Sequence, residues 1–172
     1  MRRTALLATL ALSLALPAAS AAQVSLMGGV GVTNPLGDLN DAADVGWHAL
    51  AGVQLGIATI PIQLRADGGY HSFGAQSSTP AVDVLSGALS LVVPFPGVGL
   101  SPYVLGGIGM YRTSFDDDAI ENQSDTGIHG AFGVDIGAAG GFGGFAEVRF
   151  VDVNTNAEGS RRFVTATLGI RL

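Results

Sequence analysis

The feature that most constrains the fold is a period-two alternation of apolar residues with small or polar ones. Eight segments carry it, and turn-rich stretches separate them. Each runs to about ten residues or a little more, whereas a soluble strand commonly has about five or six and a tilted bilayer-crossing strand needs about 9–11. The segments cover residues 23–33, 47–57, 62–73, 82–95, 102–115, 128–138, 142–153 and 162–172.

The connections between these segments alternate in length. After the second, fourth and sixth segments they are short, as in "ATIP" and "PGVGLS". After the others they are mostly longer and polar, as in "DDDAIENQSDTG". Short turns at one end and longer loops at the other are typical of outer-membrane barrels, whose short turns face the periplasm. The pattern predicts an all-β fold, an eight-stranded antiparallel up-and-down transmembrane β-barrel.

The N-terminal residues have the order of a secretory signal peptide. Arg2 and Arg3 precede an apolar run from Ala5 to Leu16, and a small-residue exit follows at residues 19–21. Residues 1–22 are therefore predicted to be a cleaved signal peptide, and residues 23–172 the barrel domain. A retained transmembrane helix is the alternative, although the apolar run is short for a bilayer.

The net charge and the cysteine content limit the functions that the chain can have. Loss of Arg2 and Arg3 with the signal peptide would lower the net charge from −6 to −8, with 6 basic against 14 acidic residues. Such an acidic chain lacks the basic footprint of a nucleic-acid binder. It also has no cysteine, so an exported protein of this kind must be stabilised by packing or by a membrane.

The two faces of most segments differ in polarity. In residues 62–73, for example, Leu64, Ala66 and Tyr70 alternate with Arg65 and Asp67. The polar rows are rich in small residues and their charges nearly balance, which suits a crowded interior where buried charges must be paired. We therefore expect the polar rows to face the barrel lumen. The predicted lumen ion-pair network consists of Arg65, Asp67, Arg112, Asp135, Glu147, Arg149 and Arg171.

The apolar rows are expected to face lipid, with aromatic residues near both interfaces. In "SPYVLGGIGMYRTSF", Tyr103, Leu105 and Tyr111 share one parity and Arg112 has the other. We expect the two tyrosines to face lipid and Arg112 to enter the lumen. Ordinary core aromatics of a β-sandwich are the alternative. The predicted aromatic girdle consists of Trp47, Tyr70, Phe95, Tyr103, Tyr111 and Phe142.

The stretches "SPYVLGGIGMY", "GFAEVRF" and "FVTATLGIRL" give the chain a resemblance in pattern. It resembles the small eight-stranded outer-membrane β-barrels, the group that includes opacity-type proteins and the membrane domain of outer-membrane protein A. The resemblance implies residence in the cell outer membrane, with the lipid bilayer and the barrel-assembly machinery as partners. A monomer is expected.

Several residues invite a chemical interpretation. His48, His71 and His129 share the lumen parity and could in principle hold a metal, but polar filling of the barrel mouth is the preferred interpretation. His71 and Ser72 point to opposite faces of one strand, so they cannot form a nucleophile–base pair there. No cofactor or metal is predicted. The acidic loop residues Asp116, Asp117, Asp118, Glu121 and Asp125 are candidates for contact with divalent cations or surface polysaccharide.

The preferred function is a structural or surface-interaction role, exercised by acidic loops on a barrel whose lumen is filled rather than open. The protein is not expected to be an enzyme. One alternative is a periplasmic, lipocalin-like carrier of an apolar ligand, which requires Leu105, Phe132, Val148 and Leu168 to point inward. The other is an outer-membrane enzyme that modifies lipid, with catalytic residues drawn from different strands.

Overall fold

The structure, a computed structural model, describes residues 22–37, 39, 43–57, 60–75, 82–115, 123–137, 142–154 and 160–172. Residues 1–21 of the predicted signal peptide lie outside these ranges, and Ala22 already begins the first strand. Among the described residues, no helix is long and apolar enough to cross a membrane. The strands are β1 Ala22–Leu36, β2 Ala43–Ile57, β3 Gln63–Ala75, β4 Val82–Pro94, β5 Leu100–Phe115, β6 Gln123–Ile136, β7 Gly143–Asn154 and β8 Ser160–Arg171.

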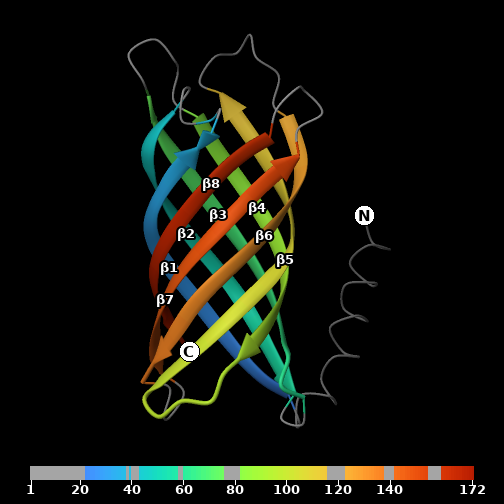
Figure 1. The fold of residues 1–172 in the computed structure, drawn as a ribbon, viewed down its shortest axis with the longest axis vertical. Helices are drawn as coiled ribbons and strands as arrows, with labels where there is room; N and C mark the ends of the chain where they lie inside the picture. The colour runs from blue at the N-terminus through green and yellow to red at the C-terminus, as the bar shows by residue number, and fades with distance from the viewer. Residues whose placement is uncertain are drawn as a thin grey trace, which may run out of the picture.

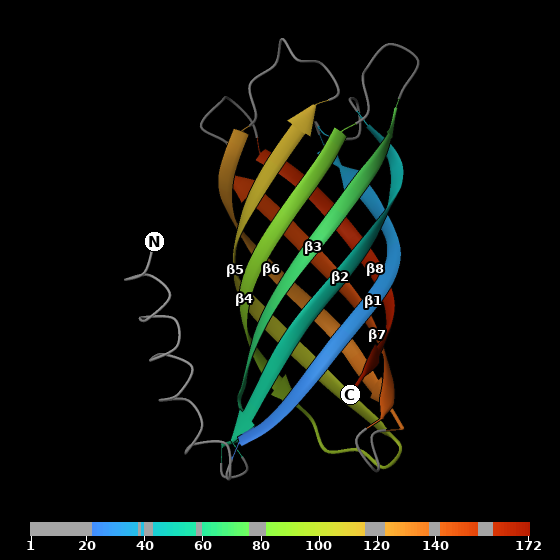
Figure 2. The same ribbon diagram turned by 180° about the vertical axis from the view of Figure 1, so that it is seen from behind.

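These eight strands form one closed, all-antiparallel barrel, which confirms the predicted fold class. Each strand pairs with its sequence neighbours, and β1 also pairs with β8, with Gly29 opposite Gly169, to close the cylinder. The strands are strongly tilted, and the barrel is longer than it is wide (Figures 1 and 2). Closure leaves no sheet edge without a backbone partner, which is the condition for a β structure to exist in lipid.

The connections are more even in length than the sequence suggested. At the end that we call the loop end, strands join through residues 37–42, 76–81, 116–122 and 155–159; at the opposite turn end they join through 58–62, 95–99 and 137–142. The predicted contrast in length was wrong because polar residues next to the loops belong to strands. Thr126, for example, is paired with Asn154 in the β6–β7 ladder. Pairing is a backbone property, so polar side chains above the apolar belt do not end it.

The outward face is an apolar belt. Ile108 on β5, Phe132 on β6 and Leu168 on β8 are 65%, 57% and 69% exposed in the isolated chain. Such a contiguous apolar surface would be unfavourable in water and is suited to lipid. Of the four residues that a lipocalin-like carrier would turn inward, only Leu105 is buried; Phe132, Val148 and Leu168 face out.

Buried side chains from all along the barrel point into the lumen. An apolar cluster lies toward the loop end, a smaller one lies toward the turn end, and polar side chains occupy the space between them. Close packing of this kind is expected of eight strands, whose interior is just wide enough for side chains. The loop-end cluster contains Phe73, Val84, Tyr111, Val151, Val153 and Phe163; the turn-end cluster contains Val92, Tyr103 and Leu105.

Candidate functional site in the barrel lumen

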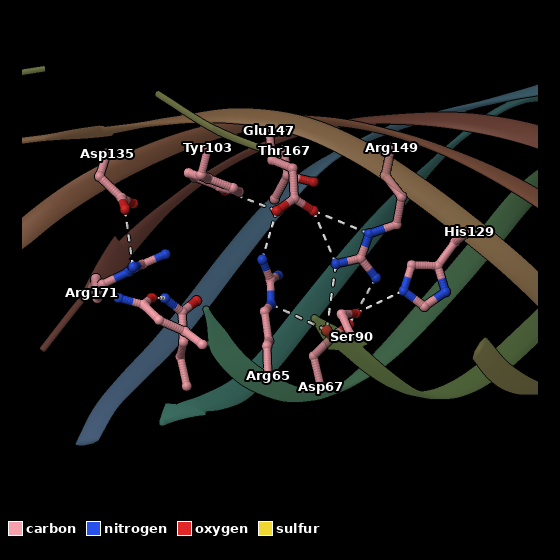
Figure 3. A network of polar contacts seen from close by, with 12 residues as sticks. Arg65, Asp67, Ser90, Tyr103, His129, Asp135, Glu147, Arg149, Thr167 and Arg171 are labelled. Atoms are coloured by element: carbon pink, nitrogen blue, oxygen red, sulfur yellow. Dashed lines mark hydrogen bonds and ion pairs between the residues drawn. The ribbon is translucent and has the colours of Figure 1, made fainter. Parts of the chain in front are cut away.

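Four charged side chains form a closed ring of ion pairs in the lumen, which we call the four-charge ring: Arg65, Asp67, Glu147 and Arg149. Arg65 Nη1 lies 2.6 Å from Glu147 Oε2, and Arg65 Nε lies 3.1 Å from Asp67 Oδ2. Arg149 completes the ring, with Nη1 2.8 Å from Asp67 Oδ1 and Nη2 2.9 Å from Glu147 Oε1. The members come from β3 and β7, which are not neighbouring strands, so the ring spans the lumen (Figure 3).

The four-charge ring is shielded from solvent and carries no net charge. The side chains of Arg65 and Glu147 have no exposed area, and those of Asp67 and Arg149 are 5% and 9% exposed. Desolvation of a single charge would be very costly, but two cations alternating with two anions compensate one another. Period two places Arg65 and Asp67 on the same face of β3, and Glu147 and Arg149 on the same face of β7.

Two aromatic residues contact the four-charge ring. The Tyr103 hydroxyl donates a hydrogen bond to Glu147 Oε2 over 2.8 Å. The guanidinium carbon of Arg65 lies 6.0 Å from the centroid of the Phe145 ring. Glycines make room for the aromatic rings: a Cβ on Gly133 would lie 2.2 Å from Tyr103, and a Cβ on Gly169 would lie 2.3 Å from Phe145. Tyrosine and phenylalanine therefore fill space that the small residues on neighbouring strands leave.

A second ion pair lies toward the turn end. Arg171 Nη1 is 3.0 Å from Asp135 Oδ2, and the two side chains are only 13% and 14% exposed. The Arg171 guanidinium also lies 5.8 Å from the Tyr103 ring centroid. Nearby, Gln54 donates a hydrogen bond to Gln63. A cavity of about 340 Å³ opens beside these residues at the turn end of the barrel.

The three histidines all face the lumen. His129 shares a 2.7 Å hydrogen bond with Ser90, close to the four-charge ring (Figure 3). It lies in the middle of β6 rather than near a strand end, because that strand begins earlier than the sequence suggested.

His48 and His71 lie closer to the loop end and stack with ring centroids 5.4 Å apart. His48 bonds to Thr33 at 3.0 Å and to Thr167 at 2.8 Å, and His71 bonds to Ser86 at 3.3 Å. In the part of the chain that the structure describes, no group of three potential metal ligands is brought together. The two imidazoles are instead hydrogen-bonded to hydroxyl groups of other strands.

The predicted faces of β5 were reversed. Tyr103, Leu105 and Tyr111 are 0%, 6% and 3% exposed and point into the lumen, so neither tyrosine belongs to an aromatic girdle. Arg112 is exposed on the outer surface and does not belong to the lumen network. Both tyrosines fill lumen space beside glycines, and the Tyr103 hydroxyl also finds a hydrogen-bond acceptor in Glu147. One signal in the sequence could have predicted the correct faces of β5. It is the apolar row of Val104, Ile108 and Met110, which faces outward.

The four remaining girdle candidates face outward. Trp47 and Tyr70 lie toward the loop end, 54% and 38% exposed, with ring centroids 5.6 Å apart. Phe95 and Phe142 lie next to the turn end, 47% and 64% exposed. An aromatic belt places such residues near both membrane interfaces. That these four residues form a belt stays a prediction.

Of the five residues predicted for the acidic loop, the structure describes one, Asp125. Asp116, Asp117, Asp118 and Glu121 lie outside the described residues. Asp125 was assigned to the loop incorrectly: it belongs to β6, is 8% exposed and faces the lumen. Its polar neighbours in the sequence suggested a loop, but they pair with β5 as a regular strand, with Asp125 opposite Tyr111.

Sequence reasoning missed the uncharged partners of the lumen network. Tyr103, Ser90 and Thr167 each bond to a charged or imidazole side chain from another strand. Ser90 and Thr167 could be placed on lumen parity from alternation, but their partners depend on barrel stagger. The arrangement as a whole links non-neighbouring strands across the lumen through polar side chains.

Comparison with known proteins agrees with this geometry. A family model described as an outer membrane protein beta-barrel domain matches residues 4–171. No curated protein shows significant sequence similarity to the chain.

Among solved structures, neisserial surface protein A (NspA) aligns with a TM-score of 0.76 at 15% identity, covering 88% of this chain and 97% of that one. The N-terminal β-barrel domain of Pseudomonas aeruginosa OprF aligns with a TM-score of 0.52 at 16% identity, covering 87% and 97%. Ail of Yersinia pestis, solved with the heparin analogue sucrose octasulfate, aligns with a TM-score of 0.52 at 14% identity, covering 88% and 97%. At these identities the structural likeness shows the fold alone.

Proposed function

Since the chain belongs to the family of outer membrane proteins with a β-barrel domain and lies in the bilayer of the cell outer membrane, we propose that it is a sealed barrel that acts through its outer surface and loops. The loop end faces the cell exterior and the turn end faces the periplasm, as is general for bacterial barrels. Assembly requires the barrel-assembly machinery, and the folded protein is a monomer.

The observation that carries the proposal is the four-charge ring. It joins β3 to β7 across the lumen, and its two most buried members, Arg65 and Glu147, are 0% and 2% exposed. Above it toward the loop end, the stacked histidines and the apolar cluster around Phe163 also lie in the lumen. An ion entering the lumen would have to break several buried, charge-assisted hydrogen bonds, which favours a barrel that does not conduct.

We propose that the connections at the loop end are the place for interactions with the surroundings. The connection 116–122 contains Asp116, Asp117, Asp118 and Glu121. Carboxylate oxygens are the ligands that divalent cations such as Ca²⁺ prefer. We propose that this connection contacts surface polysaccharide through bridging divalent cations. A sulfated polyanion such as the one bound to Ail would also need a bridging cation at so acidic a stretch.

The protein is also proposed to lack catalytic activity. The hydrogen bond between Ser90 and His129 resembles a nucleophile–base pair, but the two residues are only 2% and 5% exposed within the lumen. At this burial Ser90 is closed to a substrate in the folded barrel. The contact is therefore better explained as packing than as activation of a nucleophile.

Conductance measurement tests the sealed barrel. Purified protein, folded into planar lipid bilayers, should show no stepwise conductance above the leak of the bilayer. A barrel of open-pore type in the same membrane is the positive control. Regular single-channel steps that scale with salt concentration would contradict the proposal, because they require a continuous aqueous path past the four-charge ring.

A further inference from the structure

Arg112 is a cation on the lipid-facing side of the barrel. It is exposed on the outer surface of β5, and no ion-pair or hydrogen-bond partner for it lies among the described residues. Across the sheet, it is opposite Leu85 on β4 and Ser124 on β6. An unpaired guanidinium on an apolar face is unfavourable in the middle of a bilayer and tolerable near an interface, where it can meet an anionic headgroup.

An apolar groove of about 810 Å³ lies on the outer surface next to Arg112. It follows two cross-strand rows, one through Gly68, Gly87 and Met110, the other through Ala66, Leu89, Ile108 and Ile128. A smaller hollow of about 330 Å³ shares Gly87 and Met110 with the groove and has Arg112 in its wall. The two hollows therefore form one depression that connects an apolar surface to a guanidinium.

The glycines explain why the surface is hollow at this place. A Cβ added to Gly87 would have no atom within 4 Å, and one added to Gly68 would have its nearest neighbour at 3.7 Å. Larger outward side chains, Leu89 and Met110, stand beside them and form the walls. The missing side chains leave a trough of the kind that a flexible acyl chain can fill.

The groove changes polarity along its length. Because the strands are tilted, a cross-strand row that runs from β3 to β6 rises toward the loop end (Figure 2). Its low end is formed by Ala66 and Gly68, whereas Thr126 and Asn154 line the raised end, and Ser124 lies beside Arg112. Hydroxyl and amide groups together with a guanidinium suit a phosphorylated sugar, and the apolar end suits its acyl chains.

We propose that this depression binds one phosphorylated, acylated glycolipid of the outer leaflet, with a phosphate on Arg112 and an acyl chain over Gly68 and Gly87. The inference rests on the proposed function, because it takes the loop end to be the outer-leaflet end. Charge complementarity selects an anionic lipid. Asp83, the nearest carboxylate along β4, is opposite Ser114 rather than Arg112 and makes no ion pair with it.

Native mass spectrometry of the full protein, folded in detergent micelles and mixed with diphosphorylated lipid A, tests the inference. One lipid A should stay bound to the wild-type barrel. Arg112→Gln should lower the bound fraction about tenfold through loss of a bidentate phosphate contact, and Gly87→Leu should lower it similarly by filling the groove.

Two matched variants provide the controls. Arg162→Gln removes another outer-surface arginine, one that is paired with Asp152 and lines neither hollow. Gly130→Leu adds a side chain at an outward glycine of β6 that is equally open, with the nearest atom to its Cβ at 3.8 Å, but that does not line the groove. Both variants should bind lipid A as the wild type does.

Three results would overturn the inference: wild-type retention by both groove variants, equal retention of lipid A without its phosphates, or equal retention of phosphatidylglycerol. Gly68→Leu replaces any groove variant that fails to fold. Heat-shifted migration on unboiled gels shows whether each variant is folded. A wild-type protein without a heat-shifted band would contradict the proposed barrel function itself, whereas a folded barrel that binds no lipid A would contradict only this inference.

Discussion

Arg65 and Glu147 are 82 positions apart in the chain, yet Nη1 of the arginine lies 2.6 Å from Oε2 of the glutamate inside the barrel. Because β3 and β7 are not adjacent, this contact links opposite parts of the wall across the lumen. The barrel is therefore held together by side chains in its interior as well as by its backbone ladders. The lumen combines this polar centre with an apolar cluster toward each end, and the outer surface is apolar where it meets lipid.

Loss of one member of the four-charge ring should destabilise the barrel strongly. Glu147→Gln leaves Arg65 and Arg149 with Asp67 as the one anion that they share, so the buried ring carries an uncompensated positive charge. We expect the free energy of unfolding to fall by about 3–5 kcal/mol, the usual cost of breaking a buried pair from one side. Urea titration in lipid vesicles, with heat-shifted migration as the readout of folding, measures the change.

The exposed pair Arg162–Asp152 is the matched control, since its side chains are 52% and 27% exposed. Arg162→Gln should change the free energy of unfolding by less than about 1 kcal/mol. If Glu147→Gln were as mild as Arg162→Gln, the ring would have no structural role.

The two lumen tyrosines should differ in their response to loss of the hydroxyl. Tyr103→Phe removes a hydrogen bond to the carboxylate of Glu147 and should cost about 1.5–3 kcal/mol. The Tyr111 hydroxyl has no hydrogen-bond partner among the described residues, so Tyr111→Phe should be nearly neutral. The same urea titration compares them, and equal effects would show that the Tyr103–Glu147 contact is not formed.

Lysine scanning of the outer surface should follow depth in the bilayer. Leu168 is 69% exposed in the apolar belt, and Leu168→Lys should cost about 2–4 kcal/mol if it lies at mid-bilayer. Ser124 faces outward near the loop end of β6, where lysine should cost about 0–1 kcal/mol. Folding yield into vesicles and urea midpoints report both values. Equal tolerance of the two substitutions would place Leu168 outside the hydrocarbon region.

Ser90 should not behave as an activated nucleophile. Its hydroxyl is buried beside His129, so a fluorophosphonate probe should fail to label the folded protein in membranes. Ser90→Ala should leave the labelling pattern unchanged. Covalent modification of Ser90 in the folded barrel, lost in the alanine variant, would reopen the possibility of an enzyme.

Alternation in the sequence was sufficient to predict the strand number, the barrel and the faces of most strands. In the middle of β3, β7 and β8, charged and hydroxyl side chains share one parity and aliphatic side chains the other, so polarity and aliphatic content indicate the same faces. Nearer the loop end the alternation breaks down, and Asp152 and Arg162 lie on the outward parity. In β5 the criteria conflict, because aromatic Tyr103 and Tyr111 occupy one row and aliphatic Val104 and Ile108 the other. Treating aromatic residues as lipid-facing gave the wrong answer there.

The contacts within the lumen could not be predicted from a single sequence. Period two places Arg65 and Glu147 on inward faces, but the stagger of the barrel decides that they meet. The strand ends were also difficult, because backbone pairing continues through polar residues such as Thr126 and Asp125 beyond the apolar belt. Side-chain polarity reports the bilayer boundary more directly than it reports the end of a strand.

The most direct test of the whole account is the face that β5 presents to lipid. Nuclear Overhauser effects between acyl-chain protons and the methyl groups of β5, measured in lipid nanodiscs, distinguish the two faces residue by residue. We expect cross-peaks from the acyl chains to Val104 and Ile108, and none to Leu105. Cross-peaks to Leu105 with none to Ile108 would reverse the face of β5 and contradict the contact of Tyr103 with Glu147 in the lumen.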